Sequence, residues 1–494
     1  MENLSIIILF LFVLFTLLGT GVWVGLALMG VAWVGMELFT SRPVGDVMLT
    51  TVWSASSSWT LTALPLFIWM GEILFRTRLS QDMFTGLSPW MARLPGGLVH
   101  TNIVGCTVFA AVSGSSAATL TTVGKMSIPE LRKRKYPEPM IIGTLAGAAT
   151  LGLMIPPSLT LIVYGVTINE SITKLFFAGI VPGLVLAAMF MGYVAVYSKA
   201  SKSWHPLSEP VMSLSEKLRN SRFLIPVLLL ISIVIGSMYL GFATATEAAA
   251  FGVIGGLVLA ASQGTLSAKT FAQSLMGATR TSAMIALILA GAAFLSLSMG
   301  FTGLPRALAN LIAEWKLSQF ELLMVLLIFY IILGCFLDGI SSVVLTMAVV
   351  EPMVRQAGID LIWFGIFIVV VVEVAQITPP IGFNLFVLQG MTNHEMSFIS
   401  RASIPMFLIM VLMVFVLILF PDLATWLPEN MRPGLLNCFS NFCSQRDSLN
   451  RPPFASSLSS NMAPSGATST SLIRPIRLSR ITLWRAGRLF CSCI

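Results

Sequence analysis

The feature that most constrains this fold is a pair of helix-breaking motifs placed inside long apolar stretches. Ser113-Gly114-Ser115-Ser116 comes first and Ile155-Pro156-Pro157-Ser158 follows it. Proline removes a backbone donor, and glycine and serine leave main-chain groups free of helical hydrogen bonds. At bilayer depth, such groups are costly unless protein, water, an ion or a substrate satisfies them. We therefore expect two broken helices that line a site.

The same pair of motifs recurs in the second half of the chain, as Asp338-Gly339-Ile340-Ser341-Ser342 and then Thr378-Pro379-Pro380. Gly114 and Gly339 are 225 positions apart, and Pro156 and Pro379 are 223 positions apart. An odd number of predicted crossings separates equivalent points, so the two copies should be inverted relative to each other. An inverted repeat with paired broken helices is typical of secondary transporters.

Composition excludes an ordinary soluble globule. The mean hydropathy is +0.89 and only 10% of residues are charged, against about a quarter in soluble domains. The chain is thus predicted to be an all-α polytopic membrane protein, with about ten transmembrane helices plus two re-entrant hairpins. Met1-Glu2-Asn3 offers no basic start, so no cleaved signal peptide is expected.

The net charge is +8, and many of the basic residues cluster in short loops between apolar runs. Such loops indicate topology rather than nucleic-acid binding, and the positive-inside rule places the open end of the first hairpin in the cytoplasm and that of the second outside.

The apolar runs predict where each element lies. Hairpins are expected at 97–128 and 320–351, an interfacial stretch at 46–58 and an amphipathic piece at 79–94. Crossings are expected at 5–18, 21–39, 60–75, 139–166, 175–198, 222–242, 246–263, 281–299, 362–388 and 404–425, with a basic loop at 269–280. This divides the chain into scaffold helices with an interfacial arm (1–95), a first transport unit (96–198), a cytoplasmic loop with scaffold helices (199–280), a second transport unit (281–432) and a tail (433–494).

The broken segments supply the candidate binding groups. Unwound carbonyls near Ser113, Gly152 and Pro157 have the hard-oxygen character that suits Na⁺, whereas hairpin-tip amides favour an anion. Two alternatives remain open: the small residues of the first tip can be a helix–helix contact, and Asp338 can be a helix N-cap. Glu351 and Glu373 are less informative, since either can sit at an interface. The candidate substrate-binding residues are Gly114, Ser115, Ser116, Thr119, Asp338, Gly339, Ser341, Ser342 and Asn384.

Catalytic chemistry has no support in the sequence. No nucleophile–base pair, paired catalytic carboxylates or phosphate loop is present, and the three histidines are scattered. The chain is therefore predicted not to be an enzyme and to need no cofactor. Since no ATP site is visible either, an ion gradient would have to drive transport.

Several motifs, in a fixed order, resemble a known family. They are Val112-Ser113-Gly114-Ser115-Ser116, Leu151-Gly152-Leu153-Met154-Ile155-Pro156-Pro157-Ser158 and Ile377-Thr378-Pro379-Pro380-Ile381-Gly382-Phe383-Asn384. Over about residues 1–432 they are similar to the large, DctM-like membrane subunit of tripartite ATP-independent periplasmic (TRAP) transporters.

The resemblance implies a Na⁺-driven elevator importer, a multi-pass protein of the bacterial inner membrane. It would work with a small four-helix membrane subunit and a periplasmic binding protein that captures an organic acid of the C4-dicarboxylate, keto acid or sialic acid class. The family's Na⁺ sites would fall on Ser113, Gly152, Ile155 and Pro157 in one half, and on Gly334, Ala375, Thr378 and Ile381 in the other. A self-sufficient Na⁺/dicarboxylate symporter and a channel remain as alternatives.

Residues 433–494 depart from the family pattern. This tail has seven arginines, no lysine and four of the six cysteines. It is predicted to be disordered and unrelated to the fold.

Overall fold

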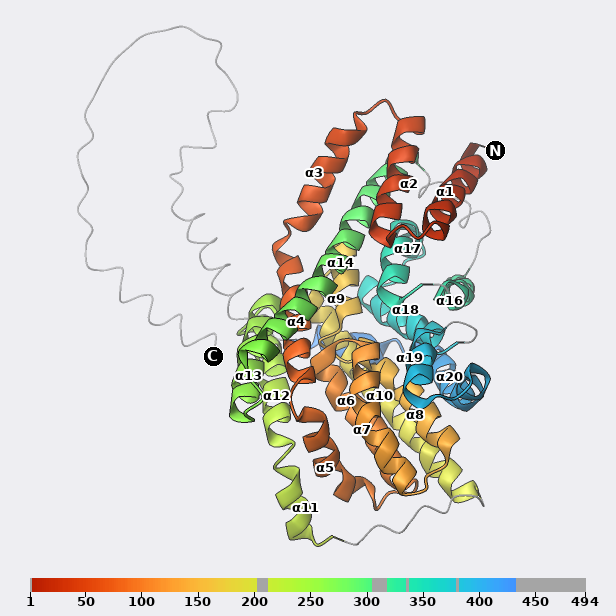
Figure 1. The fold of residues 1–494 in the computed structure, drawn as a ribbon. Coiled ribbons are helices and arrows are strands. Elements are labelled where there is room, and N and C mark those ends of the chain that lie inside the picture. Colours follow the sequence, from red (N-terminus) through yellow and green to blue (C-terminus); the bar gives the residue numbers. More distant parts are fainter. Residues whose placement is uncertain (1, 202–211, 304–317, 335–336, 379–381, 432–494) are drawn as a thin grey trace, which may run out of the picture. The chain divides into compact units, whose positions relative to one another are not determined.

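The computed structural model describes residues 2–431, apart from 202–211, 304–317, 335–336 and 379–381. The elements in this described part are all helices, and they belong to one compact unit, Met1–Leu436 (Figure 1). The predicted tail lies outside the described residues. The elements are α1 (Glu2–Gly19), α2 (Val24–Phe39), α3 (Val44–Ser56), η1 (Trp59–Thr62), α4 (Ala63–Phe75), α5 (Leu79–Met91), η2 (Gly97–Val99), α6 (His100–Ser113), α7 (Ser116–Lys133), α8 (Glu138–Met154), α9 (Leu159–Ile168), α10 (Ile172–Ala200), α11 (Leu214–Ser221), α12 (Ile225–Tyr239), α13 (Ala245–Ser262), α14 (Ala268–Thr302), α16 (Gln319–Gly334), α17 (Gly339–Gln356), α18 (Leu361–Gln376), α19 (Phe383–Thr392), α20 (Met396–Leu419) and α21 (Asp422–Glu429).

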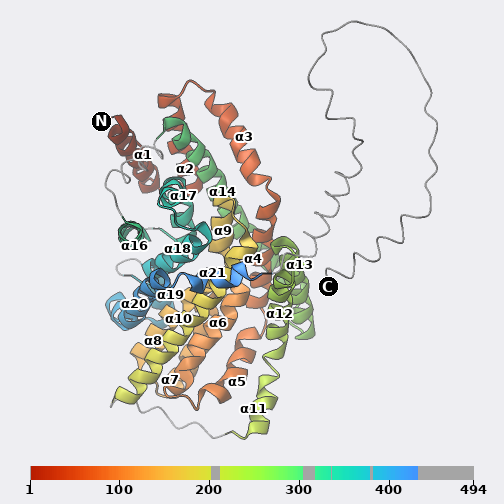
Figure 2. The ribbon, with the colours of Figure 1, turned by 180° about the vertical axis from the view of Figure 1, so that it is seen from behind.

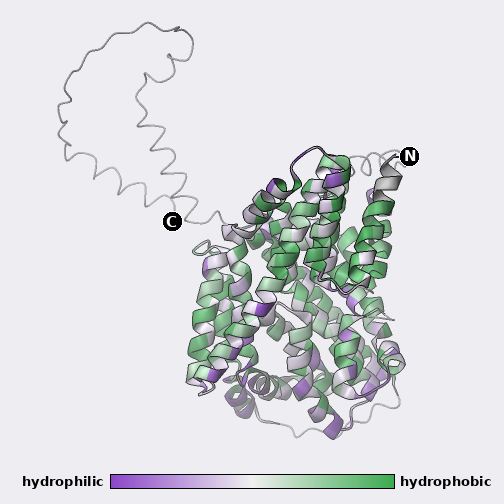
Figure 3. Ribbon diagram, turned by 45° about the horizontal axis from the view of Figure 1, so that its top comes forward, coloured by the Kyte–Doolittle hydropathy of each residue, from purple (hydrophilic) through white to green (hydrophobic). Residues whose placement is uncertain are grey.

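The helices have the length and composition of a polytopic membrane protein. Within the described ranges, five are long and apolar enough to cross a membrane, or seven if each of two bent pairs counts as one span, and shorter apolar helices accompany them. Figure 3 shows hydrophobic residues along most helices and hydrophilic residues gathered mainly toward one end. The all-helical polytopic prediction is thus confirmed, while the number of ten crossings stays a prediction.

Matching elements of the two halves have similar lengths and exchange partners. Helices α7 and α17 each have 18 residues, and α9 and α19 each have 10. Helix α19 packs on α7, and α9 packs on α17. In the same way, α14 packs along α2 and α4 packs along α13. The two halves therefore pack against each other through pairs of helices that are equivalent by the repeat.

Two segment predictions need correction, and a third is refined. The predicted basic loop 269–280 is part of α14, which runs for 35 residues without a proline, so Lys269 and Arg280 lie on a helix. The stretch 46–58 is largely helix α3, which packs on α14 and bends by 53° into η1 and α4, while its place at the membrane interface stays a prediction. The last predicted crossing ends at Leu419, after which the separate helix α21 packs on α10 and α18 (Figure 2).

The most deeply buried helices are the two that lead into the proline breaks. In α8, every residue from Met140 to Met154 is buried, and in α18 nearly every residue from Leu361 to Gln376 is. A helix that is apolar all round belongs in the interior of the protein. This packing places the C-terminal ends of both helices inside the unit.

Candidate functional site

The first hairpin tip docks on the break between α8 and α9. Gly114 ends α6 with φ +60°, a left-handed conformation that favours glycine. A Cβ atom added to Gly114 would lie 2.5 Å from the Pro157 carbonyl oxygen. In addition, the Leu159 amide donates to the Gly114 carbonyl oxygen at 3.3 Å. Only a residue without a side chain allows this approach.

Oxygen atoms gather around this contact. The Ser113 and Thr119 hydroxyl oxygens are 2.7 Å apart, and Thr119 Oγ1 donates to the Ser115 carbonyl oxygen at 2.8 Å. A Cβ atom on Gly152 would lie 2.8 Å from that same carbonyl oxygen. Ser158 caps α9 by accepting from the Leu161 amide at 3.2 Å. The structure thus brings the predicted residues of the first half together, with Ile155 in the break beside them.

The second hairpin docks on the end of α18 in the same manner. Gly334 ends α16 where an added Cβ atom would collide with Ala375, and a Cβ atom on Gly339 would lie 2.7 Å from Gln376 Nε2. Thr378 Oγ1 donates to the Val374 carbonyl oxygen at 2.7 Å. Ile381, with Pro379 and Pro380, lies outside the described residues.

Asp338 is the N-cap of α17. Its carboxylate accepts hydrogen bonds from the amides of Ile340 at 3.2 Å and Ser341 at 3.3 Å. The N-cap interpretation therefore describes the geometry of this residue, which is exposed at the tip.

A side-chain contact joins the two halves. Ser116 Oγ donates to Asn384 Oδ1 at 2.8 Å across 268 sequence positions. Asn384 is fully buried, and its Nδ2 donor has no hydrogen-bond partner among the described residues. Ser342 Oγ and Thr160 Oγ1 are buried and unpartnered in the same sense. Thr160 was not predicted, although it precedes Asn384 by 224 positions and the repeat offset could have found it.

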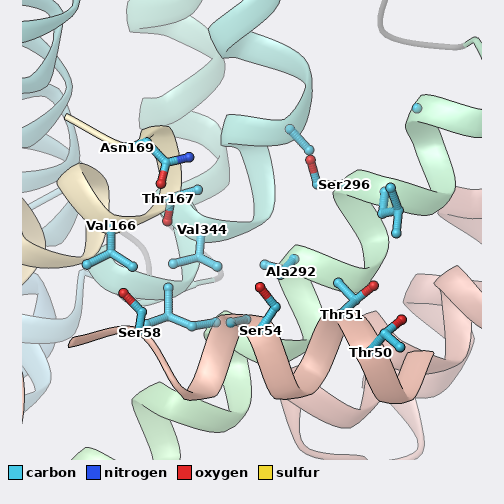
Figure 4. A pocket seen from close by; sticks show the side chains of 16 residues that line it. Thr50, Thr51, Ser54, Ser58, Val166, Thr167, Asn169, Ala292, Ser296 and Val344 are labelled. Carbon is cyan, nitrogen blue, oxygen red and sulfur yellow. The ribbon is translucent and has the colours of Figure 1, made fainter. Parts of the chain in front are cut away.

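A hydroxyl-lined cavity of about 730 Å³ lies between α3, α9, α14 and α17 (Figure 4). Its polar lining includes Thr50, Thr51, Ser54, Ser58, Thr167, Asn169 and Ser296, and none of its described lining residues is charged. The volume is in the range of small-molecule pockets. Val344 and Ala348 of α17 also line the cavity, and Ser341 precedes them by one and two helical turns on the same face. Sequence reasoning missed this lining because it depends on the packing of α3 against α14, which no local pattern encodes.

Glu373 does not take the interfacial position that the sequence leaves open for it. It is fully buried in the last turn of α18. The helix around it is apolar on all sides, which the sequence alone could not distinguish from a lipid-facing helix.

Comparisons with known proteins agree with these features. The family model described as "Tripartite ATP-independent periplasmic transporter, DctM component" matches residues 10–423. The C4-dicarboxylate TRAP transporter large permease protein DctM of Pseudomonas aeruginosa is 30% identical over 379 residues, which cover 76% of this chain and 88% of that protein. The sialic acid TRAP transporter large permease protein SiaM of Vibrio cholerae is 27% identical, with 84% and 96% covered.

Two further comparisons extend the range. The isethionate TRAP transporter permease protein DctMQ of Oleidesulfovibrio alaskensis is 30% identical over 81% of this chain, and the chain spans only 62% of that longer protein. Among solved structures, the YdaH transporter of Alcanivorax borkumensis is similar with a TM-score of 0.54 at 12% identity, covering 76% of this chain and 88% of that one. This second likeness concerns the fold alone.

Proposed function

Because the chain belongs to the DctM component family of tripartite ATP-independent periplasmic transporters, as a multi-pass permease of the bacterial inner membrane and not an enzyme, we propose that it imports an organic acid driven by Na⁺ entry. The observation that carries the proposal is the pair of docked breaks. In each half, a glycine-containing hairpin tip lies against the end of a buried helix. Such unwound ends supply the main-chain oxygens that bind coupling ions in secondary transporters.

One Na⁺ site is proposed in each half. The first would use Ser113, Gly152, Ile155 and Pro157, and the second Gly334, Ala375, Thr378 and Ile381. The close approach of Gly152 to the Ser115 carbonyl oxygen, at 2.8 Å from an added Cβ atom, supports the first site. The Gly334–Ala375 contact supports the second. Oxygen ligands without a soft donor suit a hard cation.

The substrate is proposed to bind between the two tips. Helices α7 and α17 begin there, and helix N-termini favour anions. The buried Asn384 Nδ2, beside Ser116, has no hydrogen-bond partner within the described ranges, so it can donate to a carboxylate oxygen. The hydroxyls of Ser341 and Ser342 and the remaining tip residues named from the sequence complete this proposal. The hydroxyl-lined cavity along α17 would then be the route to the site.

The relatives' names cover C4-dicarboxylates, sialic acid, isethionate and ectoine, which supports an organic solute and, in our proposal, an organic acid. Transport would use an elevator movement of the hairpins and broken helices, α6–α9 and α16–α19, against a scaffold of the remaining helices. A small four-helix membrane subunit and a periplasmic binding protein would be the partners. Selection among organic acids would then rest mainly with the binding protein.

Reconstitution tests this function. The chain is inserted into proteoliposomes with a candidate small membrane subunit and a candidate periplasmic binding protein, and uptake of labelled C4-dicarboxylates, keto acids and sialic acid is measured. Saturable uptake that requires both an inward Na⁺ gradient and the binding protein is expected. Uptake that needs no binding protein would instead identify a self-sufficient symporter, and single-channel currents would identify a channel.

A further inference from the structure

A buried carboxyl group lies in the last turn of α18. Glu373 is fully buried, and neither of its carboxyl oxygens has a hydrogen-bond partner among the described residues, although the main chain of Leu153 lies beside the group. An ionised carboxylate in such a place is costly unless a positive charge accompanies it. An ionised Glu373 therefore needs a positive charge nearby.

Protein side chains do not supply it within the described part of the chain. The helices packed against α18 are α8, α9, α10, α16, α17, α19, α20 and α21, and no charged side chain on them acts on Glu373. The basic residue of α17, Arg355, is already paired with Glu351 at 2.6 Å. The carboxyl group can therefore either hold a proton or accept a mobile cation as its counter-charge, and the experiment below separates these two states.

The backbone around Glu373 also favours a cation. Leu153 is in the last turn of α8 and Glu373 is in the last turn of α18, and helix C-termini carry partial negative charge. The start of α17 at Gly339 approaches the same place, because an added Cβ atom there would lie 3.5 Å from Leu153 Cδ1 and 2.7 Å from Gln376 Nε2. Its positive helix end is offset by the Asp338 carboxylate that caps it.

We propose that the Glu373 carboxylate, with the neighbouring Gln376 amide, binds a third Na⁺ between the two Na⁺ sites proposed above. Gln376 follows Glu373 by three residues, so the two side chains share one face of α18, and Gln376 is itself buried. The inference rests on the proposed Na⁺-coupled function and deepens it. With three Na⁺ and one dicarboxylate, each transport cycle would move one net positive charge inward.

Binding of ²²Na⁺ to the purified full-length chain in lipid nanodiscs tests the site without knowledge of the substrate. Glu373→Gln keeps the shape of the side chain and removes its charge, so it should bind one Na⁺ fewer per chain at saturation. The matched control Glu351→Gln removes a carboxylate from a partly exposed ion pair and should bind as many Na⁺ as the wild type.

An unchanged Na⁺ count in Glu373→Gln would overturn the proposal and assign Glu373 a structural or proton-holding role. If that variant is not recovered from membranes, Glu373→Asp decides the matter, since it keeps the charge on a shorter side chain. A full Na⁺ count with one site weakened by about 10-fold supports the proposal, and wild-type binding in this variant overturns it. A wild-type chain that binds no Na⁺ would instead refute the proposed function itself.

Discussion

Gly114→Ala is the sharpest test of the docked hairpin tip. An alanine at φ +60° takes a left-handed conformation that costs about 1–2 kcal/mol. Its Cβ atom would stand 2.5 Å from the Pro157 carbonyl oxygen, whereas ordinary contact begins at 3.4 Å. The tip must therefore withdraw by about 0.9 Å from the break, the difference of these two distances.

The cost of the withdrawal can be added to the backbone strain. The hydrogen bond from the Leu159 amide to the Gly114 carbonyl oxygen is worth about 1 kcal/mol, and overpacking costs about 1–3 kcal/mol. We expect the free energy of unfolding to fall by about 3–6 kcal/mol in total. Because a shift near 1 Å spoils a preorganised site, Na⁺ affinity should fall further than stability alone explains.

Gly264→Ala is the matched control. Gly264 has φ +68°, and an added Cβ atom there meets nothing within 4 Å, so the variant should show only the cost of the left-handed conformation, about 1–2 kcal/mol. Thermal unfolding of both purified variants and Na⁺-dependent uptake in proteoliposomes measure the difference. Equal losses in the two variants would refute the close contact between the tip and the break.

Three other predictions concern separate parts of the chain. Asn384→Asp replaces the buried donor by an acceptor. Uptake should fall by at least about 10-fold, which corresponds to the loss of one hydrogen bond to a charged group, while ²²Na⁺ binding is kept. Wild-type uptake in this variant would contradict substrate binding by Asn384. Asp338→Ala should lower the free energy of unfolding by about 1 kcal/mol, and Asp338→Ser should restore most of that loss. Thermal unfolding measures both variants, and equal stability of Asp338→Ala and the wild type would contradict a capping role. Deleting residues 433–494 should leave both uptake and the amount of membrane-inserted protein within about twofold, and lost uptake at unchanged insertion would contradict this.

The main elements and breaks were predictable because their signals are local. Glycine, proline and clustered serines interrupt helices. The internal repeat places the same breaks in both halves, so each half supports the prediction for the other. The extent of α14 was not predictable by the same reasoning, since Lys269 and Arg280 suggested a loop although neither prevents a helix.

The finer features of the site depend on contacts between distant segments. Ser116 meets Asn384 only because α19 packs on α7, and no spacing in the sequence encodes that meeting. The burial of Glu373 likewise depends on the helices that surround α18, which a linear pattern does not show. Thr160 could have been predicted from the sequence, because the repeat offset relates it to Asn384.

The exchanged packing of α9 on α17 and of α19 on α7 bears on how tightly the proposed ion and substrate movements would be coupled. Because the two halves contact each other at both places, a displacement of one hairpin would displace the other in the proposed mechanism. A carrier loaded with ions alone would then not complete the movement, and uncoupled ion leakage would be suppressed.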